Sequence, residues 1–98
     1  MMEQVGYRDG AVELAGLHAR PEGPVRAAVA IYPTFMNTTA VVEAKAAELV
    51  EAGYAVLIGD FYGPETPADG DDAFAAMSRL RSDPASMRQR LRATLDLL

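Results

Sequence analysis

Two short apolar runs, separated by a helical pattern, dominate this chain. Residues 27–32 are apolar without alternation, and residues 54–59 form a second run of the same kind. Such runs are typical of strands that are buried on both faces, as in parallel sheets. Between them, apolar residues recur at the spacing of one helix face, at Val42, Ala46, Leu49 and Val50. Residues 27–60 therefore predict a strand, a helix and a parallel strand, joined by a right-handed crossover.

The loop between the first strand and the helix is the first candidate for function. Pro33 cannot donate to a neighbouring strand, and the polar residues after it lead into the helix, which Thr38 or Thr39 can cap. Gly53 supplies the left-handed stop of that helix. Residues 33–39 thus lie at the carboxyl end of a parallel strand, where open α/β sheets bind their ligands.

A β-hairpin precedes this unit. Residues 3–8 and 11–20 flank Asp9-Gly10, a residue pair typical of a two-residue hairpin turn. The alternation of the second strand is lost at Gly16, and an isolated glycine in a strand often marks a bulge. We expect an antiparallel hairpin at the edge of the sheet, with a bulge at Gly16.

The last third of the chain predicts a loop over residues 63–70 and two amphipathic helices. Asp83-Pro84 starts the second helix with an N-cap and a proline at the first position. The apolar stripes of the two helices consist of Phe74, Met77 and Leu80, and of Met87, Leu91, Leu95 and Leu98. Because the sequence stops on a stripe and contains only two parallel strands, we expect residues 1–98 to be the N-terminal portion of one incomplete α/β domain.

Composition and charge exclude several classes of function. The chain has 98 residues, half of them hydrophobic, and no apolar run approaches the roughly 20 residues of a membrane helix. Its start lacks the features of a secretory signal, so a cytoplasmic protein is expected. The absence of cysteine excludes a disulfide framework, a thiolate zinc site and a cysteine nucleophile within the chain. A net charge of −5 disfavours nucleic-acid and acidic-membrane binding.

Catalytic and cofactor motifs are missing from the sequence. No G-x-G-x-x-G, Walker lysine or G-x-S-x-G follows either strand, and the single histidine, His18, lies in the hairpin. The serines of the C-terminal helices, Ser78, Ser82 and Ser86, have no histidine near them in sequence. We therefore expect no cofactor, no metal, and no esterase activity from these 98 residues alone.

Three segments nevertheless resemble one family, the dienelactone hydrolases of the α/β-hydrolase superfamily. They are A-V-A-I-Y-P-T-F-M-N at residues 28–37, the helix and strand of residues 42–63 ending in D-F-Y-G, and the helix of residues 87–98. The resemblance covers nearly the whole chain, and the preceding hairpin also fits. It implies an α/β-hydrolase fold and hydrolysis of a small-molecule carboxylic ester or lactone through an acyl-enzyme.

The resemblance also assigns roles to residues. The family's Cys, Asp and His triad lies downstream of Leu98, with the cysteine in a G-x-C-x-G elbow, so none of the three is present here. The loop after the first parallel strand resembles the one that donates a backbone N–H to the oxyanion hole, which implies Thr34, with Phe35 as a second donor. Two positions depart from the family, since Pro33 stands where many members carry a glutamate and Met36 where a glycine is common.

Residues after the second parallel strand are candidates for the substrate pocket. Asp60 begins a segment that resembles the family's D-L-Y-G, and it either acts as a catalytic acid or accepts backbone N–H groups and shapes the turn. Tyr62, Arg79 and Arg81 are expected to line the pocket and to bind a substrate carboxylate. The alternative for the arginines is a solvated helix face.

A rival interpretation is a non-catalytic, flavodoxin-like module that binds a partner through its open sheet edge. In the hydrolase interpretation, the remainder of the domain or a second chain occupies that edge. The coding sequence beyond Leu98 distinguishes the two. A strand followed by G-x-C-x-G or G-x-S-x-G favours the enzyme, and a stop codon favours the module.

Overall fold

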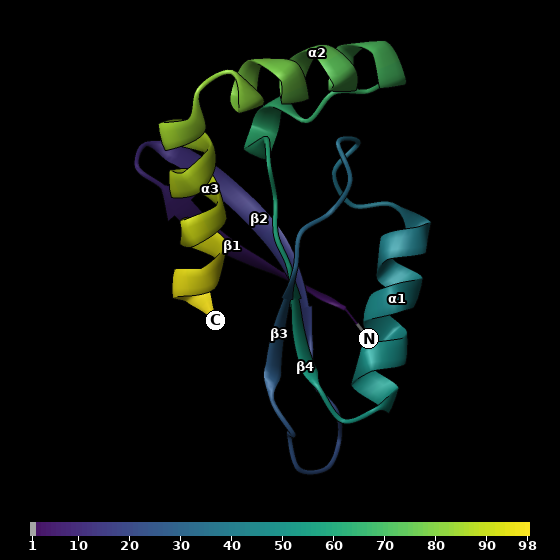
Figure 1. The fold of residues 1–98 in the computed structure, drawn as a ribbon. Helices are drawn as coiled ribbons and strands as arrows, with labels where there is room; N and C mark the ends of the chain where they lie inside the picture. Colours follow the sequence, from purple (N-terminus) through teal and green to yellow (C-terminus); the bar gives the residue numbers. More distant parts are fainter. Residues whose placement is uncertain (1) are drawn as a thin grey trace.

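The computed structural model describes residues 2–98, apart from the side chain of Glu65. It is an α/β structure in which helices lie on both faces of a mixed sheet (Figure 1). The elements in chain order are β1 (Glu3–Asp9), β2 (Val12–Ala19), β3 (Ala28–Ile31), α1 (Ala40–Glu51), β4 (Ala55–Ile58), the short 3-10 helix η1 (Gly63–Glu65), α2 (Gly70–Arg81) and α3 (Pro84–Leu97).

The sheet has the strand order β1-β2-β4-β3 within the described residues. The hairpin β1–β2 is antiparallel and β2 pairs antiparallel with β4, whereas β3 and β4 are parallel. The predicted edge hairpin and the predicted parallel unit are both confirmed. The sheet separates α1 from α3 (Figure 1). Because β3 and β4 are parallel, the loops that follow them lie together with η1 at one end of the molecule.

Gly16 does not mark a bulge, so that prediction is wrong. The hairpin register runs without a slip from Glu3 opposite His18 to Asp9 opposite Val12. A Cβ atom at Gly16 would lie only 2.6 Å from the carbonyl oxygen of Ile58 in β4. The glycine is therefore required for the close approach of β2 to β4.

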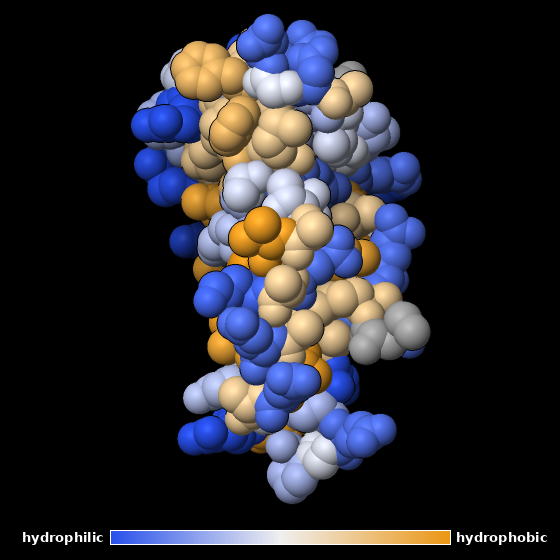
Figure 2. Space-filling model, turned by 90° about the vertical axis from the view of Figure 1, so that its right-hand side faces the viewer, coloured by the Kyte–Doolittle hydropathy of each residue, from blue (hydrophilic) through white to orange (hydrophobic). Residues whose placement is uncertain are grey.

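Helix α1 forms as the sequence predicts. Thr39 is its N-cap and its hydroxyl accepts from Val42 N–H at 3.4 Å, while Gly53 follows the helix with a φ of +100°. Its buried face joins the sheet in one core cluster, made of Ala19, Val42, Ala46, Val56 and Ile58. Alanines, charged residues and Val41 cover the outer face, which Figure 2 shows as a mixture of hydrophobic and hydrophilic patches.

Leu49 and Val41 provide a test of this helix orientation. Leu49 is half-buried and packs against the core cluster, whereas the side chain of Val41 is 74% exposed. Leu49→Ala should therefore lower the free energy of unfolding by about 2 kcal/mol, and Val41→Ala by less than about 0.5 kcal/mol. Urea unfolding of the two variants measures both values, and equal losses would contradict the orientation.

The apolar stripes predicted for α2 and α3 are only partly correct. Phe74 on α2 and Leu95 on α3 are 69% and 53% exposed, and Leu98 is also exposed. The fully buried residues of these helices are Ala73 and Thr94. No helix within residues 2–98 has the length and apolar character needed to cross a membrane.

Polar contacts explain the different orientation of α3. Thr94 Oγ1 lies 2.9 Å from the hydroxyl of Tyr7 in β1, and Arg90 Nε donates to Asp9 Oδ2 at 2.7 Å. The Arg90 and Asp9 side chains are only 14% and 9% exposed. Because α3 presents these polar groups to the sheet, its leucines lie further out than the hydrophobic pattern predicts.

Candidate active site

A tight turn at the carboxyl end of β3 forms the centre of the candidate site. Asn37 N–H donates to the Thr34 carbonyl at 2.8 Å, and the two residues form an isolated antiparallel bridge. Asn37 has a φ of +66°, while Phe35 and Met36 between them have negative φ values. This pattern corresponds to a type I turn followed by a left-handed residue, a common way to close a short loop.

Thr34 contributes to the turn with its side chain. Its hydroxyl accepts from Met36 N–H at 3.1 Å and donates to the Asn37 carbonyl at 3.0 Å. The Asn37 carbonyl thus accepts from the Thr34 hydroxyl, and no described group accepts a hydrogen bond from Thr34 N–H. No described group accepts a hydrogen bond from Phe35 N–H. Both amides singled out by the sequence, those of Thr34 and Phe35, are therefore available to a ligand.

The side chain of Asn37 connects this turn to the segment after β4. Its Nδ2 donates to Asp60 Oδ1 at 2.7 Å and to Thr66 Oγ1 at 3.3 Å, and its Oδ1 accepts from Phe61 N–H at 3.0 Å. Both the donor and the acceptor of the amide are therefore used. This residue was missed in the sequence analysis.

Asp60 is buried, with 5% of its surface exposed, and its carboxylate is surrounded by donors. Oδ1 accepts from Tyr62 N–H and Gly63 N–H at 3.0 Å each as well as from Asn37, and Oδ2 accepts from Ala15 N–H at 2.9 Å. Burial alone would raise the pKa of Asp60, but the bonds from Ala15, Asn37, Gly63 and Tyr62 lower it below its ordinary value. The turn-shaping role predicted for Asp60 is confirmed.

Tyr62 also acts on the turn. Its hydroxyl donates to the Phe35 carbonyl at 2.6 Å, and burial raises the pKa of this hydroxyl above its ordinary value. The Tyr62 side chain also lines a hollow of about 370 Å³, together with Arg79 of α2. Arg81 is exposed and does not line this hollow. The structure thus brings together two of the three predicted pocket residues.

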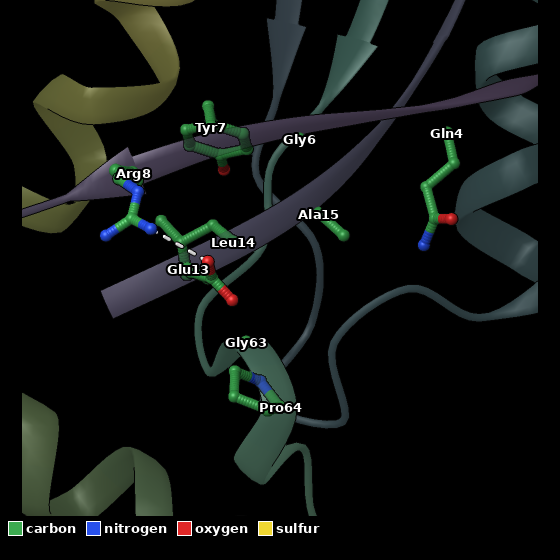
Figure 3. A pocket seen from close by; sticks show the side chains of 9 residues that line it. All are labelled: Gln4, Gly6, Tyr7, Arg8, Glu13, Leu14, Ala15, Gly63 and Pro64. Carbon is green, nitrogen blue, oxygen red and sulfur yellow. Dashed lines mark hydrogen bonds and ion pairs between the residues drawn. The ribbon is translucent and has the colours of Figure 1, made fainter. Parts of the chain in front are cut away.

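A larger hollow, of about 610 Å³, lies between the hairpin and η1 (Figure 3). Its charged residues are Arg8 and Glu13, which form an exposed ion pair at 2.8 Å across the two strands. Because they neutralise each other, this hollow presents no uncompensated charge to a ligand. Within the part of the chain that the structure describes, no three histidine or acidic side chains are grouped as metal ligands would be.

Comparison of the whole chain with known families identifies a match. The sequence pattern of the dienelactone hydrolase family fits residues 13–98. The chain belongs to this family. The match includes β3, the turn after it and Asp60, so a dienelactone hydrolase fold is the framework in which this site lies.

Solved structures agree with the dienelactone hydrolase assignment. A structure titled m3DLH superimposes with a TM-score of 0.87 at 26% identity, and covers 98% of this chain. A dienelactone hydrolase-like promiscuous phosphotriesterase, P91 from metagenomic libraries, gives a TM-score of 0.88 at the same identity and coverage. This chain spans 41% of the length of each. A search of curated proteins returned no match.

Proposed function

We propose that the protein carrying this chain hydrolyses carboxylic-ester or lactone bonds, and that the turn after β3 supplies part of its oxyanion hole. The observation that supports this best is the pair of amides at Thr34 and Phe35, which have no acceptor among the described groups and lie in a turn at the carboxyl end of a parallel strand. A fixed backbone donor at such a place stabilises the negative charge that develops on a carbonyl oxygen. Membership of the dienelactone hydrolase family supports the same chemistry.

In the proposed reaction a nucleophile attacks the ester carbonyl carbon, and the carbonyl oxygen takes the negative charge. The loop amide stabilises this oxyanion until the alcohol leaves, and water then releases the acid from the acyl-enzyme. The chain contains no cysteine, and its one histidine, His18, lies on β2 with Nε2 3.6 Å from Glu3. The resemblance to the family implies that residues outside these 98 would supply the nucleophile, the base and the orienting acid.

The proposal also includes the partner and the substrate. β3 ends the strand order, and exposed leucines lie on the last turns of α3, at Leu95, Leu97 and Leu98. The remainder of the hydrolase domain, or a second chain, would cover this edge and these leucines. Arg79 would bind a carboxylate carried by the substrate, since a guanidinium suits bidentate pairing with it. A cytoplasmic location is part of the same proposal.

Activity of the full-length protein tests the proposed function. It should hydrolyse p-nitrophenyl acetate and simple lactones, whereas a purified polypeptide of residues 1–98 should show no turnover above background. A phosphotriester such as paraoxon is a second substrate to test, because the structural neighbour P91 is a promiscuous phosphotriesterase. Turnover by residues 1–98 that disappears when Ser78, Ser82 or Ser86 is replaced would contradict the assignment of the nucleophile to other residues.

The rival function, a non-catalytic module that binds a partner through the edge of β3, makes the opposite prediction. A full-length protein that hydrolyses none of these compounds, and whose sequence has no nucleophile elbow, would favour the module.

A further inference from the structure

Three contacts from one short segment converge on the turn after β3. Asp60 accepts from the Asn37 amide at 2.7 Å, and Phe61 N–H donates to the other end of that amide at 3.0 Å. The Tyr62 hydroxyl donates to the Phe35 carbonyl at 2.6 Å. The residues that follow β4 therefore hold both the start and the end of a turn that lies more than 20 residues earlier in the sequence.

Asn37 is suited to this position in two independent ways. Its φ of +66° is a conformation that most side chains avoid, and asparagine and glycine adopt it most readily. Glycine would satisfy the backbone equally well but has no side chain to bind Asp60 and Phe61. A hydrogen bond to an ionised, buried carboxylate is among the strong ones. The residue thus combines the required backbone with the required contacts.

We infer that Asn37 is a positioning residue for hydrolysis, which acts through Asp60 and Phe61 to hold the amides of Thr34 and Phe35 in fixed directions. This inference rests on the proposed function. A donor stabilises an oxyanion effectively only if it is already oriented before the reaction, and small displacements of reacting groups are costly. Tyr62 fixes the other side of the same turn, so Phe35 lies between two clamped ends.

Two substitutions in the full-length protein test the inference. Asn37→Gly keeps the backbone conformation and removes both side-chain contacts. Asn37→Asp keeps the shape but brings a second carboxylate against Asp60, and two such groups cannot both ionise without repulsion. Both should lower kcat for p-nitrophenyl acetate by about 10–100-fold, with little change in KM. A displaced donor stabilises the transition state less, whereas it hardly affects the binding of the substrate.

Hydrogen exchange provides a readout that does not depend on activity. The Met36 and Asn37 amides are bonded within the turn, to Thr34, and should exchange about 10–100-fold faster in Asn37→Gly, the range that corresponds to losing a hydrogen bond to a charged group. Thr39→Ala is the matched control. It removes the N-cap of α1 two residues later and destabilises the protein, but should leave kcat and the exchange of the turn unchanged.

The outcomes are distinguishable. Unchanged exchange of the Met36 and Asn37 amides in Asn37→Gly would show that the Asn37 side chain does not hold the turn. Faster exchange with a wild-type kcat would overturn the positioning role, and so would an equal loss of kcat in Thr39→Ala. A wild-type protein that hydrolyses no ester would overturn the proposed function itself. The exchange rates would still show whether the Asn37 side chain holds the turn.

Discussion

Asp60→Ala should lower the free energy of unfolding by about 3–5 kcal/mol, the largest stability loss that we expect from a single substitution in this chain. The carboxylate accepts four hydrogen bonds, from Ala15, Asn37, Tyr62 and Gly63, and lies 5% exposed. Alanine would leave these donors without an acceptor in a region that water reaches poorly. Urea unfolding of the wild-type and variant proteins measures the difference.

Asp69→Ala is a matched control for this substitution. Asp69 is exposed and its carboxylate caps α2 by accepting from Asp72 N–H at 2.8 Å, so its removal should cost only about 1 kcal/mol. If Asp60→Ala and Asp69→Ala lower the free energy of unfolding equally, the Asp60 carboxylate does not hold β2 and the two loops together.

The pH dependence of stability provides a second check on Asp60. Its pKa is lowered in the folded protein, so the ionised group stabilises the fold above the unfolded pKa of about 3.9. That contribution is lost as the pH falls through the lower, folded pKa. The stability difference between wild type and Asp60→Asn should therefore shrink as the pH is lowered from about 5 to below 3. Asp83, whose pKa is also lowered, is present in both proteins and does not affect the comparison.

The strand-helix-strand unit could be predicted from the sequence because its apolar residues carry a clear period. Val42 and Ala46 lie on the buried face of α1, and the continuous apolar runs became the parallel strands β3 and β4. The predictions that failed involve residues whose role is set by a distant neighbour. Gly16 is needed because β4 approaches it, and Thr94 is buried because Tyr7 offers it a hydroxyl. Neither contact produces a hydrophobic pattern in the sequence around Gly16 or Thr94.

The same distinction applies to the candidate site. The position of the loop after β3 follows from strand order, so its place at the carboxyl end was predictable. The contact of Asn37 with Asp60 joins residues 23 positions apart, and hydrophobic periodicity contains no information on it. One signal was nevertheless present. Carboxyl ends of neighbouring parallel strands meet at one edge, so an asparagine after the first strand and an aspartate after the second are candidates for a contact.

Phe35→Pro should lower kcat for ester hydrolysis by the full-length protein by about 10²–10³-fold, the typical cost of losing one oxyanion donor. Phe35 is the second residue of the type I turn, where proline is favoured. The substitution therefore removes the N–H with little disturbance of the backbone. Phe35→Ala is the control, because it removes the same ring and keeps the donor, and most of the rate should remain.

Thr34 requires a different experiment, because its hydroxyl forms two hydrogen bonds within the turn. Thr34→Pro would break the turn and remove the donor together. Replacing threonine by its α-hydroxy acid analogue removes only the N–H, and Thr34→Ser keeps the hydroxyl. If Phe35 is the donor, both Thr34 variants should keep kcat within the range of Phe35→Ala. A wild-type rate in Phe35→Pro, with a loss of about 10²–10³-fold in the Thr34 backbone ester, would move the oxyanion donor to Thr34.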